Sequence, residues 1–190
     1  MKKIILSALL IAGFGVAAAP TVARAADGTI NITGLLTAGT CKITGGSPYT
    51  QAVVLPTIQA TSLTGVGTVA GATAFSFAIA GCAITGTGAP TKATTYFEPG
   101  ANIDSVTHNL LSTGGATGVE VQLLNGPGST AAASSAILLG NPTATQNSGT
   151  VTISATGTAT MNYYAQYYAS SAAPTAGTVI SAATFTMVYQ

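Results

Sequence analysis

Few side chains in this 190-residue sequence are of the kinds that carry out chemistry. The only histidine, His108, follows Asp104 by four positions, and serines are abundant, so a Ser-His-Asp arrangement can be written down. No G-x-S-x-G motif accompanies it, and a lone histidine in a Thr- and Gly-rich chain is typical of a surface or loop position. A pair of catalytic carboxylates for glycoside hydrolysis would have to come from Asp27, Glu98, Asp104 and Glu120, and their spacing favours no such pair. We therefore expect no enzyme activity and no catalytic residue, and the role of His108 stays open.

Sites for cofactors are not indicated either. Neither G-x-x-x-x-G-K-S/T nor G-x-G-x-x-G occurs, so no loop for cradling phosphate is expected. A metal site would need more histidine or cysteine ligands at shorter spacing than this chain offers. We expect no cofactor and no bound metal.

The first 25 residues differ from the rest of the chain. Lys2 and Lys3 give a positive start, residues 4–19 are almost unbroken apolar, and Ala23-Arg24-Ala25 has the small-x-small pattern of a cleavage site. A transmembrane anchor is the alternative, but the run is shorter than the ~20 apolar residues that a bilayer span needs. We interpret residues 1–25 as a secretory signal peptide and expect the rest to be exported.

Removing residues 1–25 leaves few charges. Two lysines then face four carboxylates, for a formal net charge of −2. A nucleic-acid partner is not expected, because phosphate binding needs clustered lysine and arginine. So few charges would leave a free monomer short of solvating surface, which favours a protein covered largely by copies of itself. The charges that remain are Lys42, Lys92, Asp27, Glu98, Asp104 and Glu120.

The sequence contains two cysteines, Cys41 and Cys82. Exported proteins meet an oxidising compartment, so the simple expectation for such a pair is one disulfide bond. The bridge would close a loop of about forty residues, worth ~4 kcal/mol in the chain-entropy model.

The exported part alternates between short β-forming segments and turn residues. Regular short strands broken by Gly, Pro and Asn are typical of an all-β sandwich or barrel in one domain. Residues 125–128 (Asn-Gly-Pro-Gly) and 140–142 (Gly-Asn-Pro) are strong turn signals, and residues 129–136 are expected to form a loop. The predicted strands are residues 28–37, 52–55, 73–80, 91–97, 118–124, 150–155, 159–169 and 178–189.

Two segments near the ends alternate clearly, as strands do. In residues 29–36, one face carries Ile30, Ile32, Gly34 and Leu36, and the other carries Thr29, Asn31, Thr33 and Leu35. In residues 184–189, Phe185, Met187 and Tyr189 share a face. Alternation locates strands without naming their partners, so two ordinary sandwich strands remain an alternative.

Several of these segments together resemble the major subunit of type 1 fimbriae, in the chaperone–usher pilin family. The likeness covers residues 28–190 behind the signal peptide. Each piece alone is a weak pattern, and their order and separations make the resemblance specific. The pieces are Gly-Thr-Ile-Asn-Ile-Thr-Gly at 28–34 before Thr40-Cys41, the strand 116–124, the tyrosine-rich block 163–169, residues 176–179 and the C-terminal block 183–190.

The resemblance implies an incomplete immunoglobulin-like β-sandwich that lacks its last strand and is completed by donor-strand exchange. Residues 26–38 would be the donor-strand extension and residues 39–190 the pilin domain. A periplasmic chaperone would fill the groove first, and at the outer-membrane usher the extension of the next subunit would replace it. The protein would then be a structural subunit of a fimbria that supports cell adhesion, a homopolymer on the surface of a Gram-negative bacterium.

Carried over by position, the family's roles fall on both ends of the chain. Ile30, Ile32 and Leu36 would insert into the neighbour's groove, and Gly34 would allow close backbone approach. Leu35 departs from the expected polar outward face and is expected to contact another subunit. The acceptor and chaperone-binding residues would be Phe185, Met187, Tyr189 and Gln190, with the Gln190 carboxylate held by basic chaperone residues, while Cys41–Cys82 pins the first strand.

Three alternatives stay open. A minor or adaptor pilin has the same length and physics, and sequence does not separate it from a major subunit. A monomeric secreted β-sandwich binding module would pair residues 27–38 within its own chain. The tyrosines at 163, 164, 167 and 168 could form a carbohydrate-stacking platform, but alternation divides them between two faces, which favours strand packing.

Overall fold

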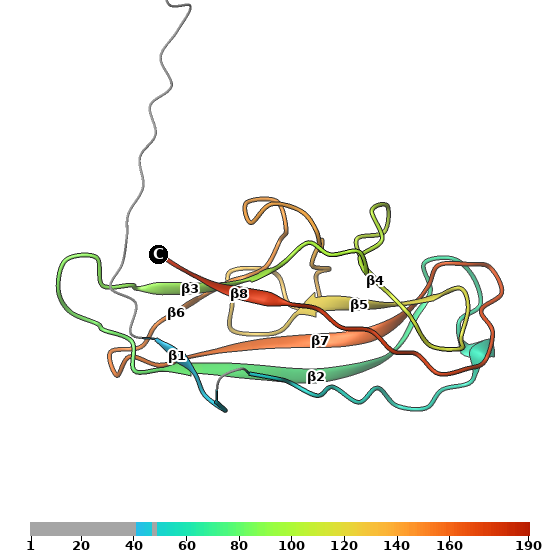
Figure 1. Cartoon of the computed structure of the whole chain (residues 1–190), viewed down its shortest axis with the longest axis horizontal. Coiled ribbons are helices and arrows are strands. Elements are labelled where there is room, and N and C mark those ends of the chain that lie inside the picture. Colours follow the sequence, from blue (N-terminus) through green and yellow to red (C-terminus); the bar gives the residue numbers. More distant parts are fainter. Residues whose placement is uncertain (1–40, 47–48) are drawn as a thin grey trace, which may run out of the picture. The chain divides into compact units, whose positions relative to one another are not determined.

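The computed structural model describes residues 41–46 and 49–190, and they form eight strands and one short 3-10 helix (Figure 1). The signal peptide and the donor-strand extension, residues 1–25 and 26–38, lie outside the described residues. Among the described residues, no helix is long and apolar enough to cross a membrane. The elements are β1 (Lys42–Ile43), η1 (Ala60–Ser62), β2 (Val69–Ala80), β3 (Lys92–Phe97), β4 (Leu110–Leu111), β5 (Val119–Asn125), β6 (Thr150–Thr152), β7 (Ala159–Ala169) and β8 (Phe185–Tyr189).

These strands form two antiparallel sheets. One has the order β1-β2-β7-β5-β4, and the other has the order β6-β3-β8. The long strands β2 and β7 pair with each other in the larger sheet. Phe75 lies opposite Tyr163, and the pairing continues to Ile79 opposite Ala159. The prediction of an all-β fold is confirmed, and the predicted strand at residues 159–169 coincides with β7.

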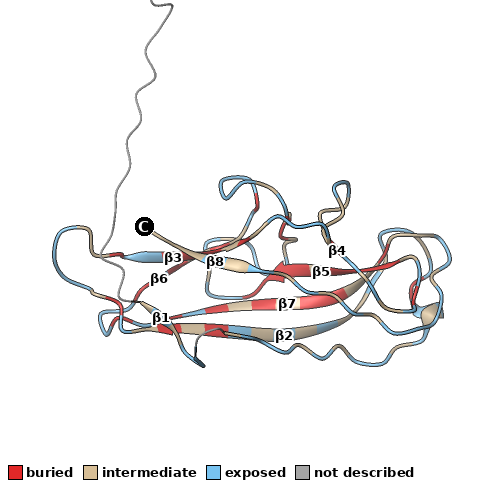
Figure 2. Ribbon diagram, viewed as in Figure 1, coloured by how far each residue is buried: buried red, intermediate tan, exposed pale blue. Residues whose placement is uncertain are grey.

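The inner faces of the two sheets meet in one hydrophobic core (Figure 2). Phe77 and Met161 are buried on the larger sheet, and Ala93 and Phe97 are buried on β3. The Tyr163 hydroxyl donates a hydrogen bond of 2.9 Å to Thr95 Oγ1, which links the sheets through a buried polar pair. The core therefore takes alternate residues from each strand, as the period of two requires.

The tyrosines of β7 follow that alternation. Tyr163 is buried in the core, and Tyr167 reaches along the same side to donate a hydrogen bond of 3.2 Å to Pro56 O. Tyr164 and Tyr168 alternate with them and lie opposite Leu124 and Glu120 on β5. The predicted division of the cluster between two faces is confirmed.

Two buried amides hold the long connection between β5 and β6. Gln146 Oε1 accepts a hydrogen bond from Phe97 N (2.9 Å), and its Nε2 donates to Phe97 O (2.8 Å). Asn125 Nδ2 donates to Asn147 O (2.7 Å), and Asn125 Oδ1 accepts from Gly149 N (2.9 Å). Because these side chains bond main-chain groups, they fix a connection that is otherwise irregular, including the predicted loop at residues 129–136.

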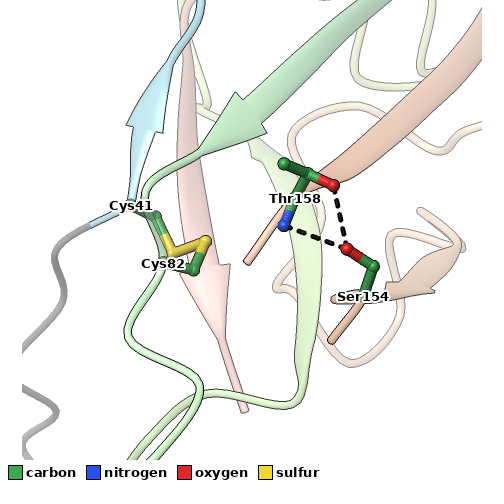
Figure 3. Close-up of a disulfide and its surroundings, with 4 residues drawn as sticks. All are labelled: Cys41, Cys82, Ser154 and Thr158. Carbon is green, nitrogen blue, oxygen red and sulfur yellow. Dashed lines mark hydrogen bonds between the residues drawn. A yellow bond between two sulfur atoms is a disulfide. The ribbon is translucent and has the colours of Figure 1, made fainter. Parts of the chain in front are cut away.

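A disulfide joins Cys41, just before β1, to Cys82, just after β2 (Figure 3). The turn between β6 and β7 packs beside it, closed by the Thr158 N–H, which donates a hydrogen bond of 3.2 Å to Ser154 Oγ. Cys82 N donates to Gly157 O at 3.1 Å. The bridge therefore lies at the start of the described domain, and Cys82 is bonded to the turn that directly precedes β7.

Replacing Gly157 by alanine should lower the free energy of unfolding by about 2–4 kcal/mol. Gly157 has a φ of +72°, and a Cβ there would lie 2.5 Å from Cys82 O. Gly86 is a matched control, because its φ is +101° with open space around the Cβ position. Urea unfolding should give a smaller loss of about 1–2 kcal/mol for Gly86→Ala. Equal losses in the two variants would contradict the close approach to Cys82.

Candidate functional site: a groove between two open edges

A cavity of about 830 Å³ opens between two extended segments, residues 49–55 and residues 179–185. Its floor consists of core side chains from both sheets, so the cavity reaches the hydrophobic interior. Phe75 and Phe77 come from β2, and Phe97 comes from β3. The rest of the floor is Leu110, Val121, Leu123, Ala165 and Tyr167.

One side of the cavity is the start of β8, which is an edge strand. Among the described residues, β8 pairs with β3 alone. Gln190 and Lys92 exchange main-chain hydrogen bonds of 2.9 and 3.0 Å, and Thr184 O accepts from Glu98 N. Since antiparallel pairs alternate, the N–H and C=O groups of Phe185, Met187 and Tyr189 point away from β3. This edge presents main-chain donors and acceptors to a further strand.

The opposite side, residues 49–55, has the alternation of a strand without a ladder partner among the described residues. Val53 and Leu55 pack against the core, while Val54 between them is 84% exposed. The prediction of a strand at residues 52–55 is therefore wrong for the structure described, although its inward and outward faces are correct. A strand is defined by pairing, and residues 52–55 pair with no strand in the part of the chain that the structure describes.

The first half of the strand predicted at residues 178–189 is also irregular, because it crosses from one sheet to the other. Thr178 O accepts from Ala116 N (3.0 Å), and Ile180 O accepts from Thr113 N (2.9 Å), beside the larger sheet. From Thr184 onward the segment pairs with β3 in the smaller sheet. Residues 179–183 of this crossing line the groove.

Three of the predicted acceptor residues, Phe185, Met187 and Tyr189, lie on the inward face of β8. Phe185 lines the cavity and stacks on Phe77, with ring centroids 4.7 Å apart. Met187 and Tyr189 are half-buried against the core, farther along β8 than the cavity lining. Burial raises the pKa of the Tyr189 phenol above its usual value. Gln190 is exposed, and its main-chain oxygen accepts hydrogen bonds from Thr91 and Lys92.

The predicted donor residues Ile30, Ile32, Gly34 and Leu36 lie outside the described residues. Sequence reasoning did not identify the far side of the groove. Val53 and Leu55 line it, and the alternation of residues 53–55 was the available signal. The crossing at residues 179–183 carries no comparable pattern.

His108 lies apart from this groove, in a smaller pocket of about 330 Å³ with Ile103 and Leu139. Its Nδ1 is 3.0 Å from Leu139 O, and its φ of +57° places it in the left-handed region at the end of a turn. Asp104 Oδ1 closes that turn by accepting from two main-chain N–H groups, of Val106 and Thr107, which lower the pKa of the Asp104 carboxyl. In the described residues, no group of three or more His, Cys, Asp or Glu side chains is arranged to hold a metal.

The floor of the groove and its β8 edge lie in the part of the chain that matches a known family, and residues 49–54 of the other edge precede that part. The family model of the type-1 fimbrial protein, A, matches residues 55–190. The chain belongs to the type-1 fimbrial protein family. Its function class is that of a structural fimbrial subunit, as the resemblance implied.

Two curated relatives of this type-1 fimbrial protein match nearly end to end. The major fimbrial subunit SMF-1 of Stenotrophomonas maltophilia is 40% identical over 178 residues, which cover 91% of this chain and 98% of the relative. The F17 fimbrial protein of Escherichia coli is 39% identical over 182 residues, 95% of this chain and 97% of the relative.

Solved structures share the fold of this type-1 fimbrial protein. A chaperone–usher pilus structure superimposes with a TM-score of 0.57 at 22% identity, covering 90% of this chain and all of that one. The P pilus rod subunit PapA gives a TM-score of 0.53 at 19% identity, covering 85% and 100%. The predicted fold class, an immunoglobulin-like pilin sandwich, is confirmed.

Proposed function

We propose that this chain builds a fimbria by donor-strand exchange, with residues 29–36 of one copy inserted into the groove of the next. One observation carries the proposal: an apolar cavity that reaches the core opens between two extended edges, residues 49–55 and the start of β8. A folded domain seldom leaves its core open beside an edge strand, because such edges promote aggregation. A strand supplied by another copy satisfies both the main-chain groups and the apolar floor.

The donor segment has an apolar face that matches the apolar floor of the groove, and a main chain that can pair with the open edge. Alternation places Ile30, Ile32 and Leu36 on one face, and their burial would contribute roughly 5–9 kcal/mol. Main-chain hydrogen bonds along the open edge of β8 add to this, at about 1 kcal/mol each before the entropy cost. Gly34 on the same face leaves room for the backbones to approach. The subunit contact would thus be made mainly of one inserted strand.

The same groove accounts for the assembly partners that we propose. Before a neighbour arrives, a periplasmic chaperone would cover the groove by pairing with β8 along Phe185, Met187 and Tyr189. A basic site on the chaperone would bind the carboxylate at Gln190. The outer-membrane usher would be the place of exchange, so the route to the cell surface passes through the periplasm.

Replacing Ile32 by aspartate should abolish filament assembly, because a carboxylate would have to be buried in the apolar groove. Thr33→Asp is the matched control, since it places the same charge on the outward face of the same strand. The measurement is electron microscopy of cells and of sheared fractions, with subunit levels in the periplasm followed by immunoblot. We expect filaments with Thr33→Asp and none with Ile32→Asp. Normal filaments from Ile32→Asp would overturn the proposal and favour a module that is complete in itself.

A further inference from the structure

Two large apolar side chains stand exposed at the mouth of the groove, one on each side. Val54 is 84% exposed on the segment 49–55, and Ile180 is 59% exposed on the segment 179–185. Both nevertheless line the cavity. Single exposed apolar residues are ordinary, but a pair facing one groove from both sides marks an interaction site.

The donor segment carries one apolar residue on its outward face. With Ile30, Ile32, Gly34 and Leu36 directed inward, the outward positions are threonine, asparagine, threonine and leucine. Leu35 is thus the only apolar side chain of the four, and insertion of the strand into the groove would leave it exposed to water. It is the feature of this segment that groove filling does not explain.

We propose that Leu35 of the incoming copy packs between Val54 and Ile180 and covers the mouth of the groove from outside. This inference rests on the proposed function, and it adds a second contact on the solvent side of the inserted strand. The inward residues fill the groove, and Leu35 adds an apolar contact that holds the inserted strand from the solvent side. The occupant is therefore a second copy of this chain, recognised by an apolar residue on each face of its extension.

Strand geometry puts Leu35 at this place. A strand inserted between two others has neighbours about 4.8 Å away on both sides, so an outward side chain reaches the outward side chains of both. Antiparallel pairing with β8 is the more stable arrangement, and it brings the C-terminal end of the donor to the start of β8. Leu35 is near that end, and the cavity lined by Val54 and Ile180 lies beside Phe185, where β8 begins.

The test uses filaments assembled from the full-length chain and measures the rate at which subunits are released in hot detergent. Leu35→Thr, Val54→Thr and Ile180→Thr should each release subunits about five- to tenfold faster than the unaltered chain. The double variant Leu35→Thr/Val54→Thr should release no faster than about the faster of its two single variants, because both remove the same contact. Val106→Thr is the control, since Val106 is also 84% exposed but does not line the groove.

The outcomes distinguish a failure of the Leu35 contact from a failure of donor-strand exchange itself. Filaments that form with Leu35→Thr and release subunits at the unaltered rate would overturn the contact at the mouth and leave donor-strand exchange intact. Full additivity in the double variant, or an equal effect of Val106→Thr, would overturn it as well. Filaments that are insensitive to Ile32→Asp would instead overturn donor-strand exchange itself.

Discussion

A chain with leucine in place of Gln146 should have a free energy of unfolding about 3–6 kcal/mol lower than the unaltered chain. Gln146 is fully buried, and its amide bonds both main-chain groups of Phe97 and the carbonyl of Asn141. β6 pairs with β3 only from Lys92 to Thr94, so this amide takes the place of a strand at Phe97. Leucine would leave these buried polar groups without a partner.

Gln166→Leu is the control for that change. Gln166 is also buried, but its Nε2 donates to a side chain, Gln122 Oε1, at 2.8 Å. We expect a loss of about 1 kcal/mol there, measured by urea unfolding of both variants. Comparable losses at the two positions would show that Gln146 does not act as a substitute for a strand.

Removing the disulfide by Cys41→Ala/Cys82→Ala should lower the free energy of unfolding by about 4 kcal/mol in the chain-entropy model. The bridge spans 41 residues and holds β1, which pairs with β2 only through Lys42 and Ile43. Without it, the start of the described domain would be held to β2 by these two residue pairs and by Thr44, whose N–H and hydroxyl both donate to Ala78 O. Because Cys41 lies three residues after the predicted donor extension, the bridge also fixes the point from which that extension leaves.

Two measurements check this prediction. Urea unfolding of the double variant should match that of the unaltered chain in reducing agent, since both lack the bridge. A loss below about 1 kcal/mol would mean that the bridge constrains the unfolded chain little.

Short β-forming segments bounded by Gly, Pro and Asn predicted most of the sandwich, including the strands near residues 73–80, 91–97, 118–124 and 159–169. Side-chain alternation predicted the inward face of β8, because the side chains of a strand divide between core and solvent. β1 and β4 were missed because two residues are too few to show a period. Residues 52–55 alternate like a strand but have no ladder partner within residues 41–46 and 49–190.

The groove was expected only through the family resemblance, and its geometry needed the structure. Its far side depends on residues 49–55 lying across from residues 179–185, more than a hundred positions later in the chain. No local sequence pattern indicates that two segments so far apart in the chain lie across from each other. Gln146 was missed for a similar reason: a glutamine in a polar loop gives no sign that its amide will cap a strand.

The most direct test of the groove is a thermal melt of the chain lacking residues 1–38, with its disulfide intact, in the presence and absence of a peptide of residues 26–38. The peptide should raise the melting temperature by roughly 10–30 °C, because it buries three large apolar side chains and pairs the open edge. The Ile32→Asp peptide should have little effect. A truncated chain that is already highly stable and ignores the peptide would contradict donor-strand completion and leave a domain complete in itself.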